Sequence, residues 1–216
     1  MSDIFREVDE EIRKDRAKAL WQRYGIYVYI VIGALILGTG GNQYWRYYQQ
    51  SQRLEESAAY QAAAAAAQDE RTTEAINAFS ALAADAGTGY AVIARLREAA
   101  ARAEAGDLEG ALAAWDALAA DDGIEDAYRD LARLLAAMHL IDDGPTDAVR
   151  QRLAPLFAEG SPWRHSAREL QAVLALREGR REEARELLQG LIDDAGTPSG
   201  GRARAEALLS ALEGQE

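Results

Sequence analysis

The sequence predicts an all-α protein, in which a single N-terminal transmembrane helix precedes a superhelix of α-hairpin repeats. Three observations predict this fold class. Residues 24–45 contain no charged side chain. The chain after them is rich in alanine, leucine, glutamate and arginine, which are strong helix formers, and poor in β-branched residues. Short segments with glycine or proline divide that region at regular intervals, which indicates helices of about 12 to 18 residues.

The uncharged run at 24–45 is long enough to cross a lipid bilayer. About twenty helical residues, at ~1.5 Å of rise each, cover the ~30 Å hydrocarbon core. Aromatic residues typical of the headgroup boundary mark both ends of the run: Trp21, Tyr24, Tyr27, Tyr44, Trp45, Tyr47 and Tyr48. The alternatives are a buried helix and a cleaved signal peptide. A long segment of mixed charge before the run, and no Ala-x-Ala after it, favour an uncleaved anchor.

Basic residues on the two flanks predict the orientation of the anchor. Residues 1–23 contain six lysines and arginines, whereas Arg46 and Arg53 are the only ones between the run and Arg71. The positive-inside rule then places residues 1–23 in the cytoplasm and residues 46–216 on the other side. In a Gram-negative bacterium this means a single-pass protein of the inner (plasma) membrane with a periplasmic domain.

The cytoplasmic segment has an apolar stripe, Ile4, Val8 and Ile12, at a spacing of four residues. This pattern predicts an amphipathic helix that docks on a cytoplasmic partner or lies against the bilayer.

Composition excludes several classes of function. The net charge is −12, and six charges of each sign cancel in residues 1–23, so the excess of acid belongs to the exported region. Such a domain would repel nucleic acid. The chain has no cysteine, and its two histidines, His139 and His165, lack the spacing of a metal site. No cofactor is predicted, and no nucleophile motif surrounds His165, so we expect a protein that is not an enzyme.

A repeat becomes visible when the exported region is aligned on three glycines, Gly106, Gly144 and Gly179. Sixteen residues before each glycine stands an aromatic residue: Tyr90, Tyr128 and Trp163. Twelve residues before each stands an alanine: Ala94, Ala132 and Ala167. Five residues after each stands a small or branched aliphatic residue: Ala111, Val149 and Ala184. Bulky apolar residues follow nine and twelve residues after each glycine: Trp115, Leu153, Leu188, Leu118, Leu156 and Leu191.

An earlier second helix fits the same frame with Ala75, Phe79 and Leu82, preceded by a degenerate first helix around residues 54–68. The successive offsets are then 36, 38 and 35 residues. A hairpin of this kind cannot bury its apolar face alone, so the hairpins are expected to stack into a superhelix. The pattern resembles the tetratricopeptide repeat. It departs from that repeat in its longer period, in the missing Leu-Gly pair and in the lack of a closing proline.

Two stretches carry a resemblance to one bacterial family. The first is the opening Met1–Glu11 (MSDIFREVDEE), which leads into Trp21–Tyr24 (WQRY) and the uncharged run. The second is Ser161–Leu170 (SPWRHSAREL), together with Gly87–Ala91 (GTGYA). In these segments and in its layout, the chain is similar to the ancillary subunit of the Sec translocon, in the form found in alphaproteobacteria. The name of this family is shared with a cell-division coordinator.

This resemblance implies a membrane-tethered periplasmic protein that associates with translocon subunits and with exported chains, and that hands clients to periplasmic chaperones. It implies no catalytic residues. A second hypothesis is a tetratricopeptide scaffold that coordinates cell-envelope or division complexes without binding clients. The sequence does not define an oligomeric state.

Five arginines are the candidate partner-binding residues: Arg95, Arg129, Arg133, Arg164 and Arg168. They directly follow the repeat aromatic or the repeat alanine, and in a tetratricopeptide hairpin these positions face the concave groove. Two pairs of like charge lie at i, i+4, which is unfavourable unless an anion lies between them. A carboxylate of a partner would supply that anion. The alternative is internal pairing with four nearby acids: Glu125, Asp126, Asp130 and Glu169.

Overall fold

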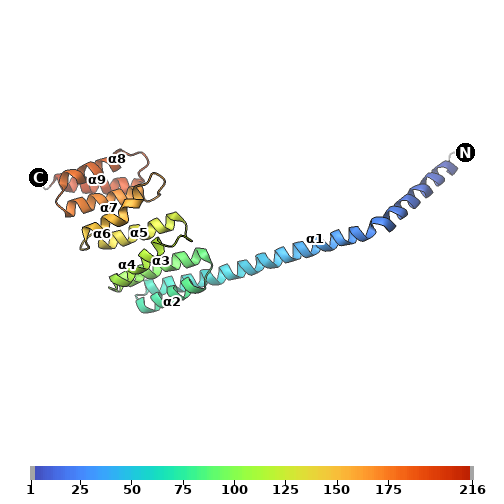
Figure 1. The fold of residues 1–216 in the computed structure, drawn as a ribbon, viewed down its shortest axis with the longest axis horizontal. Helices are drawn as coiled ribbons and strands as arrows, with labels where there is room; N and C mark the ends of the chain where they lie inside the picture. Colours follow the sequence, from blue (N-terminus) through green and yellow to red (C-terminus); the bar gives the residue numbers. More distant parts are fainter. Residues whose placement is uncertain (1–2, 215–216) are drawn as a thin grey trace. The chain divides into compact units, whose positions relative to one another are not determined.

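The region after residue 55 is a stack of antiparallel helix pairs that follow one another in chain order (Figure 1). The computed structural model describes the backbone of residues 3–214 and the side chains of residues 18, 33, 35–87 and 89–214. The chain divides into two units between Glu55 and Glu56. The helices are α1 (Asp3–Gln68), α2 (Thr72–Asp85), α3 (Thr88–Glu104), α4 (Leu108–Ala119), α5 (Asp126–Leu140), α6 (Thr146–Leu153), the 3₁₀ helix η1 (Ala154–Phe157), α7 (Arg164–Arg177), α8 (Arg181–Asp193) and α9 (Ser199–Glu213).

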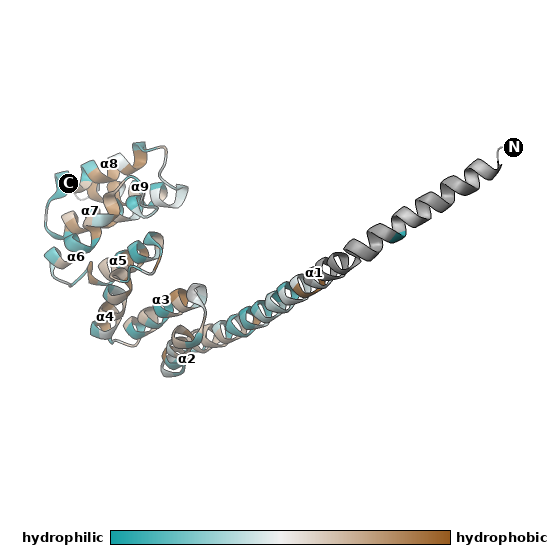
Figure 2. Cartoon of the chain, turned by 45° about the vertical axis from the view of Figure 1, so that its right-hand side comes forward, coloured by the Kyte–Doolittle hydropathy of each residue, from teal (hydrophilic) through white to brown (hydrophobic). Residues whose placement is uncertain are grey.

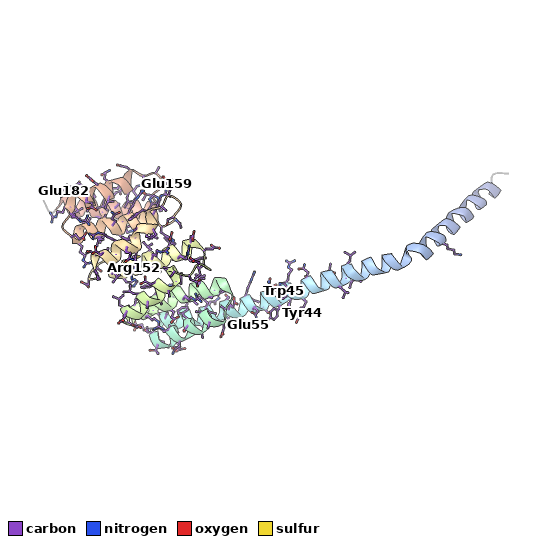
Figure 3. All side chains as sticks on the ribbon, in the orientation of Figure 1. Tyr44, Trp45, Glu55, Arg152, Glu159 and Glu182 are labelled. Atoms are coloured by element: carbon purple, nitrogen blue, oxygen red, sulfur yellow. The ribbon has the colours of Figure 1, made fainter. Side chains whose placement is uncertain are left out.

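The first unit consists of most of α1. Its described large apolar side chains are exposed, among them Tyr44 and Trp45, which Figure 3 labels. No helix in the described part of the chain is long and apolar enough to cross a membrane. The predicted span at 24–45 lies partly outside the residues whose side chains are described, and the predicted stripe in residues 1–23 lies wholly outside them. Both stay predictions.

The second unit has the predicted all-α hairpin architecture. From α2 to α9, each α-helix contacts the next one along the chain. In addition, α3 contacts α5, α5 contacts α7, and α7 contacts α9. The first helices of successive hairpins therefore lie side by side.

The predicted segments with glycine or proline separate the helices, with two shifts. The glycines at 87–89 and 196–201 predict longer breaks than are found, because α3 begins at Thr88 and α9 at Ser199, so Gly89, Gly200 and Gly201 lie in first turns. The N–H groups of a first turn need no partner within the helix, and proline is favoured just before it.

The repeat pattern marks the core. The alanines Ala94, Ala132 and Ala167 are fully buried, and so are Ala111, Val149 and Ala184 at the start of each second helix. The bulky residues of the second helices, such as Trp115, are also buried, in clusters that join neighbouring hairpins. Figure 2 shows hydrophobic, brown segments on the helices of the stack, among them α7 and α8. The periodicity therefore located the apolar core correctly.

The repeat aromatic is buried less deeply than the expected knob-and-notch packing requires. Tyr90 and Trp163 are half-buried, and 37% of Tyr128 is exposed. Trp163 packs against the core cluster around Ala167, and its Nε1 donates to the carbonyl of Ala127 at 2.8 Å. The aromatic position thus joins a hairpin to the preceding hairpin by polar and ring contacts.

The first hairpin has the degenerate first helix that the sequence predicted. Residues 56–68 of α1 supply it, and Ala63 and Ala66 pack with Phe79 of α2. Tyr60 is the aromatic residue here. Its ring lies 5.8 Å from that of Phe79 and 6.1 Å from that of Tyr90, between centroids. Tyr60 therefore connects the first hairpin to the second.

The sequence did not predict that α9 is a further first helix without a second one. Ala205 and Leu212 are its buried residues, and each comes 38 residues after its counterpart on α7, Ala167 or Leu174. Helix α9 packs on α7 and α8 and closes the C-terminal end of the stack.

Three of the four turns within hairpins share one geometry. In each, a residue with positive φ follows the first helix: Glu70 (59°), Gly106 (84°) and Gly179 (76°). The next residue donates its N–H five residues back, as in Arg180 to the carbonyl of Ala175 at 2.8 Å. This is the Schellman arrangement, in which glycine is favoured because it has no Cβ. Glu70 occupies the glycine position of the first hairpin.

Replacing Glu70 with glycine is therefore expected to stabilise the protein. The left-handed conformation costs an ordinary residue ~1–2 kcal/mol, and the greater freedom of glycine in the unfolded chain offsets part of this gain. We expect Glu70→Gly to raise the free energy of unfolding by about 0.5–1 kcal/mol in urea titrations of the full chain. Gly179→Ala, the matched control, should lower it by about 1 kcal/mol. A loss of stability in Glu70→Gly would contradict this interpretation.

Candidate partner-binding surface

The five candidate arginines lie on three adjacent first helices. Arg95 is on α3, Arg129 and Arg133 are on α5, and Arg164 and Arg168 are on α7. Since α3 contacts α5 and α5 contacts α7, the periodic positions become neighbouring positions in space. The five arginines form two groups according to their neighbours. One group lies at the turn between α4 and α5, and the other lies at the turn between α8 and α9.

Arg95 and Arg129 meet at the turn between α4 and α5. Arg95 Nη1 lies 3.1 Å from Asp121 Oδ2. Arg129 binds two carboxylates, those of Asp122 and Asp126, and these hydrogen bonds raise its pKa. Both guanidinium charges are thus neutralised within the chain.

Arg133 is tied to the same region. Its Nη1 lies 2.9 Å from Asp130 Oδ1, and its Nη2 donates to the carbonyl of Ala119 at 2.8 Å. Asp130 also accepts from Ser161 Oγ at 3.0 Å, which links α5 to the start of the next hairpin. A pocket of about 320 Å³ lies beside Arg133, lined by Asp116, Ala119, Ala120, Arg133, Gln151 and Arg152. Figure 3 labels Arg152, whose guanidinium binds both oxygens of Asp116.

Arg164 and Arg168 lie at the second turn. Arg168 Nη1 lies 3.3 Å from Asp194 Oδ2. Arg164 donates only to the carbonyl of Glu159, at 3.2 Å, and forms no ion pair within the described part of the chain. Glu159, labelled in Figure 3, lies in the segment between η1 and α7, and its side chain is exposed.

Two of the four acids proposed as internal partners fill that role, namely Asp126 and Asp130. Glu169 does not, because both of its oxygens bind Arg204 of α9, at 2.6 and 2.7 Å. Glu125 forms no ion pair among the described contacts. Whether any of the five arginines binds a partner stays a prediction.

Sequence reasoning missed the acids in the turns and one further arginine. Asp121 and Asp194 each follow their arginine, Arg95 or Arg168, by 26 residues, and this recurring offset could have identified them. Arg202 on α9 lies 38 residues after Arg164, the same offset that relates Ala205 to Ala167. Arg202 is not marked by the repeat pattern, because the residue before it is Gly201 and not an aromatic residue.

His165 is buried beside the second turn. Its Nδ1 lies 3.2 Å from Thr197 Oγ1 and 3.7 Å from Asp194 Oδ2. Burial lowers the pKa of His165, and the positive charge of Arg164 lowers it further, against the opposing effect of Asp194. The pKa of Asp194 is also lowered, chiefly by the backbone N–H of Gly196, which donates to Oδ1 at 2.8 Å.

His139 has a local contact, with its Nδ1 3.0 Å from the carbonyl of Leu135, and its ring lies tilted against that of Trp115, 4.7 Å away between centroids. No group of three or more potential metal ligands occurs among the described residues.

Comparison with known families agrees with this geometry. Residues 18–213 match the family described as tetratricopeptide repeat-like domain, so the chain belongs to this family. Comparison with curated proteins and with solved structures gave no match. A domain of this type is a protein–protein interaction module, and protein partners are therefore implied in general.

The buried histidine predicts a pH dependence of stability. The pKa of His165 in the folded protein is below the ~6.5 of an unfolded chain, so the unfolded state binds more protons as pH falls. The contribution of His165 is complete above pH ~6.5 and is lost as pH falls from there toward its folded pKa. In His165→Gln, the free energy of unfolding should fall less steeply between pH 7 and 5.5 than in the wild type. Equal slopes in urea titrations would contradict the assignment.

Proposed function

We propose that this chain is a membrane-anchored periplasmic interaction module that acts as an accessory subunit of the Sec translocon. In this role it assists exported proteins or their transfer to periplasmic chaperones. The observation that carries the proposal is the direct continuation of the uncharged run at 24–45 into a tetratricopeptide repeat-like domain within one chain. An anchor of this kind raises the effective concentration of the repeat domain beside membrane partners.

Charge and aromatic residues support the proposed location. The six basic residues of 1–23 favour a cytoplasmic N-terminus. Tyr44, Trp45, Tyr47 and Tyr48 are exposed on α1, where aromatic side chains suit the lipid headgroup region. The resemblance at Met1–Glu11 and Ser161–Leu170 supports the translocon as the partner.

The repeat domain is proposed to work by binding rather than by catalysis. The two histidines have structural contacts, His165 with Thr197 and His139 with Leu135. Arg95 and Arg133 on the first helices are paired with acids, in the manner of residues that hold a scaffold. The first helices α3, α5 and α7, which lie side by side, supply an extended surface for a peptide segment.

Photo-crosslinking in living cells tests this proposal. A photoreactive amino acid is placed at Leu37, which is 78% exposed in the predicted span, and at Tyr128, which is 37% exposed on α5. We expect crosslinks from Leu37 to channel subunits and from Tyr128 to exported chains or periplasmic chaperones. A matched probe at Glu213, at the end of α9, should recover fewer of these partners.

Crosslinks to envelope or division proteins alone would overturn the translocon role and favour the scaffold. Crosslinks from Tyr128 to cytoplasmic proteins would overturn the orientation.

A further inference from the structure

One repeat position carries an arginine on three successive first helices, and the groups that bind the guanidinium differ among the three. This position, fifteen residues before the repeat glycine, is occupied by Arg129 on α5, by Arg164 on α7 and, at the equivalent place on α9, by Arg202. Arg129 binds two carboxylates. Arg164 and Arg202 bind backbone carbonyls alone in the described part of the chain, those of Glu159 at 3.2 Å and Asp194 at 3.3 Å.

Three guanidinium groups therefore converge on a turn that offers one carboxylate. Arg164, Arg168 and Arg202 all reach the segment 194–196, where Asp194 is shared between Arg168 and a backbone N–H. Of the neighbouring acids, Glu169 binds Arg204, whereas Asp193 accepts a hydrogen bond from the neutral amide of Gln189 and keeps its charge. Among the described contacts, Arg202 donates to the carbonyl of Asp194 and forms no ion pair with Glu206, one turn further along α9. This excess of positive charge is unexpected in a domain that carries the acidic surplus of the chain.

Further observations concern the polar atoms around this turn. Arg202 Nε is buried and has no hydrogen-bond partner, as is also true of Arg129 Nε, and such an atom costs free energy unless an acceptor arrives. A Cβ at Gly196 would lie 3.1 Å from both Arg164 Nη2 and Asp194 Oδ1 and 3.6 Å from His165 Nε2, so the lack of a side chain here lets these groups approach the turn closely. Burial is the main cause of the lowered pKa of His165, and the charges of Arg164 and Arg168 lower it further against the opposing charge of Asp194.

We propose that Arg164, Arg168 and Arg202 form a carboxylate-binding site at the C-terminal end of the stack, which takes acidic side chains of a protein partner. This inference rests on the proposed interaction function and specifies the site. Guanidinium groups bind carboxylates through paired, charge-assisted hydrogen bonds. Because the three groups come from two helices, they fit a segment with several acidic residues better than a single anion. The earlier candidates Arg95, Arg129 and Arg133 serve the scaffold, since their charges are already neutralised.

Fluorescence anisotropy of the full chain in a nonionic detergent tests the site. The probe is a fluorescein-labelled decapeptide of alternating glutamate and alanine, and its glutamine counterpart is the control peptide. We expect the acidic peptide to bind and the glutamine peptide not to bind. The double variant Arg164→Gln/Arg202→Gln should weaken binding by roughly tenfold or more, since each charge-assisted hydrogen bond contributes at least that factor. Arg129→Gln, at the same repeat position, should change binding less than about twofold.

The proposal is overturned if the wild type does not bind the acidic peptide, or if Arg129→Gln weakens binding as much as the double variant does. Far-UV circular dichroism checks that the variants fold. If the double variant does not, Arg164→Lys/Arg202→Lys retains the charges, loses the forked geometry and should still weaken binding. If the acidic peptide does not bind but the cellular crosslinks are observed, the site is rejected and the proposed function is kept. If the peptide binds but no crosslinks to translocon components form, the site is kept and the translocon role is rejected.

Discussion

The stack depends on one constraint, the presence of a very small residue where each first helix meets the preceding hairpin. Ala94, Ala132 and Ala167 are fully buried there, and Ala205 repeats the arrangement on α9. A small side chain lets the helices approach closely enough for bulky residues such as Trp115 to fill the space between hairpins. In the first hairpin the same position is Ala58, which is exposed because no hairpin precedes it.

Polar contacts repeat with the same period and fix how successive hairpins align. Arg152 binds Asp116 across 36 residues, and Arg204 binds Glu169 across 35. Trp163 donates to the carbonyl of Ala127, also 36 residues away. Each contact ties one hairpin to the next, as expected of a solenoid in which every unit touches only its neighbours. The arginine site at the α8–α9 turn stands out because it departs from this mutual neutralisation.

Periodicity identified the helices, the buried alanines and the bulky core residues, because apolar packing leaves a regular trace in the sequence. It could not show that Glu169 pairs with Arg204 of α9 and not with an arginine of its own helix, since that choice depends on the path of the chain in space. Arg202 escaped notice because Gly201 stands where the other first helices carry an aromatic residue. Glu70 in the glycine position was likewise hidden, because a glutamate there resembles any other surface residue.

The most direct test of the account is the effect of enlarging one alanine on the free energy of unfolding. Ala132→Leu forces extra atoms into a closed contact between hairpins, and Ala58→Leu makes the same change at the equivalent exposed position. In urea titrations of the full chain, we expect Ala132→Leu to lose about 1–3 kcal/mol. Ala58→Leu should change stability by less than about 0.5 kcal/mol. Equal effects of the two substitutions would contradict the claim that close approach at this alanine holds the stack together.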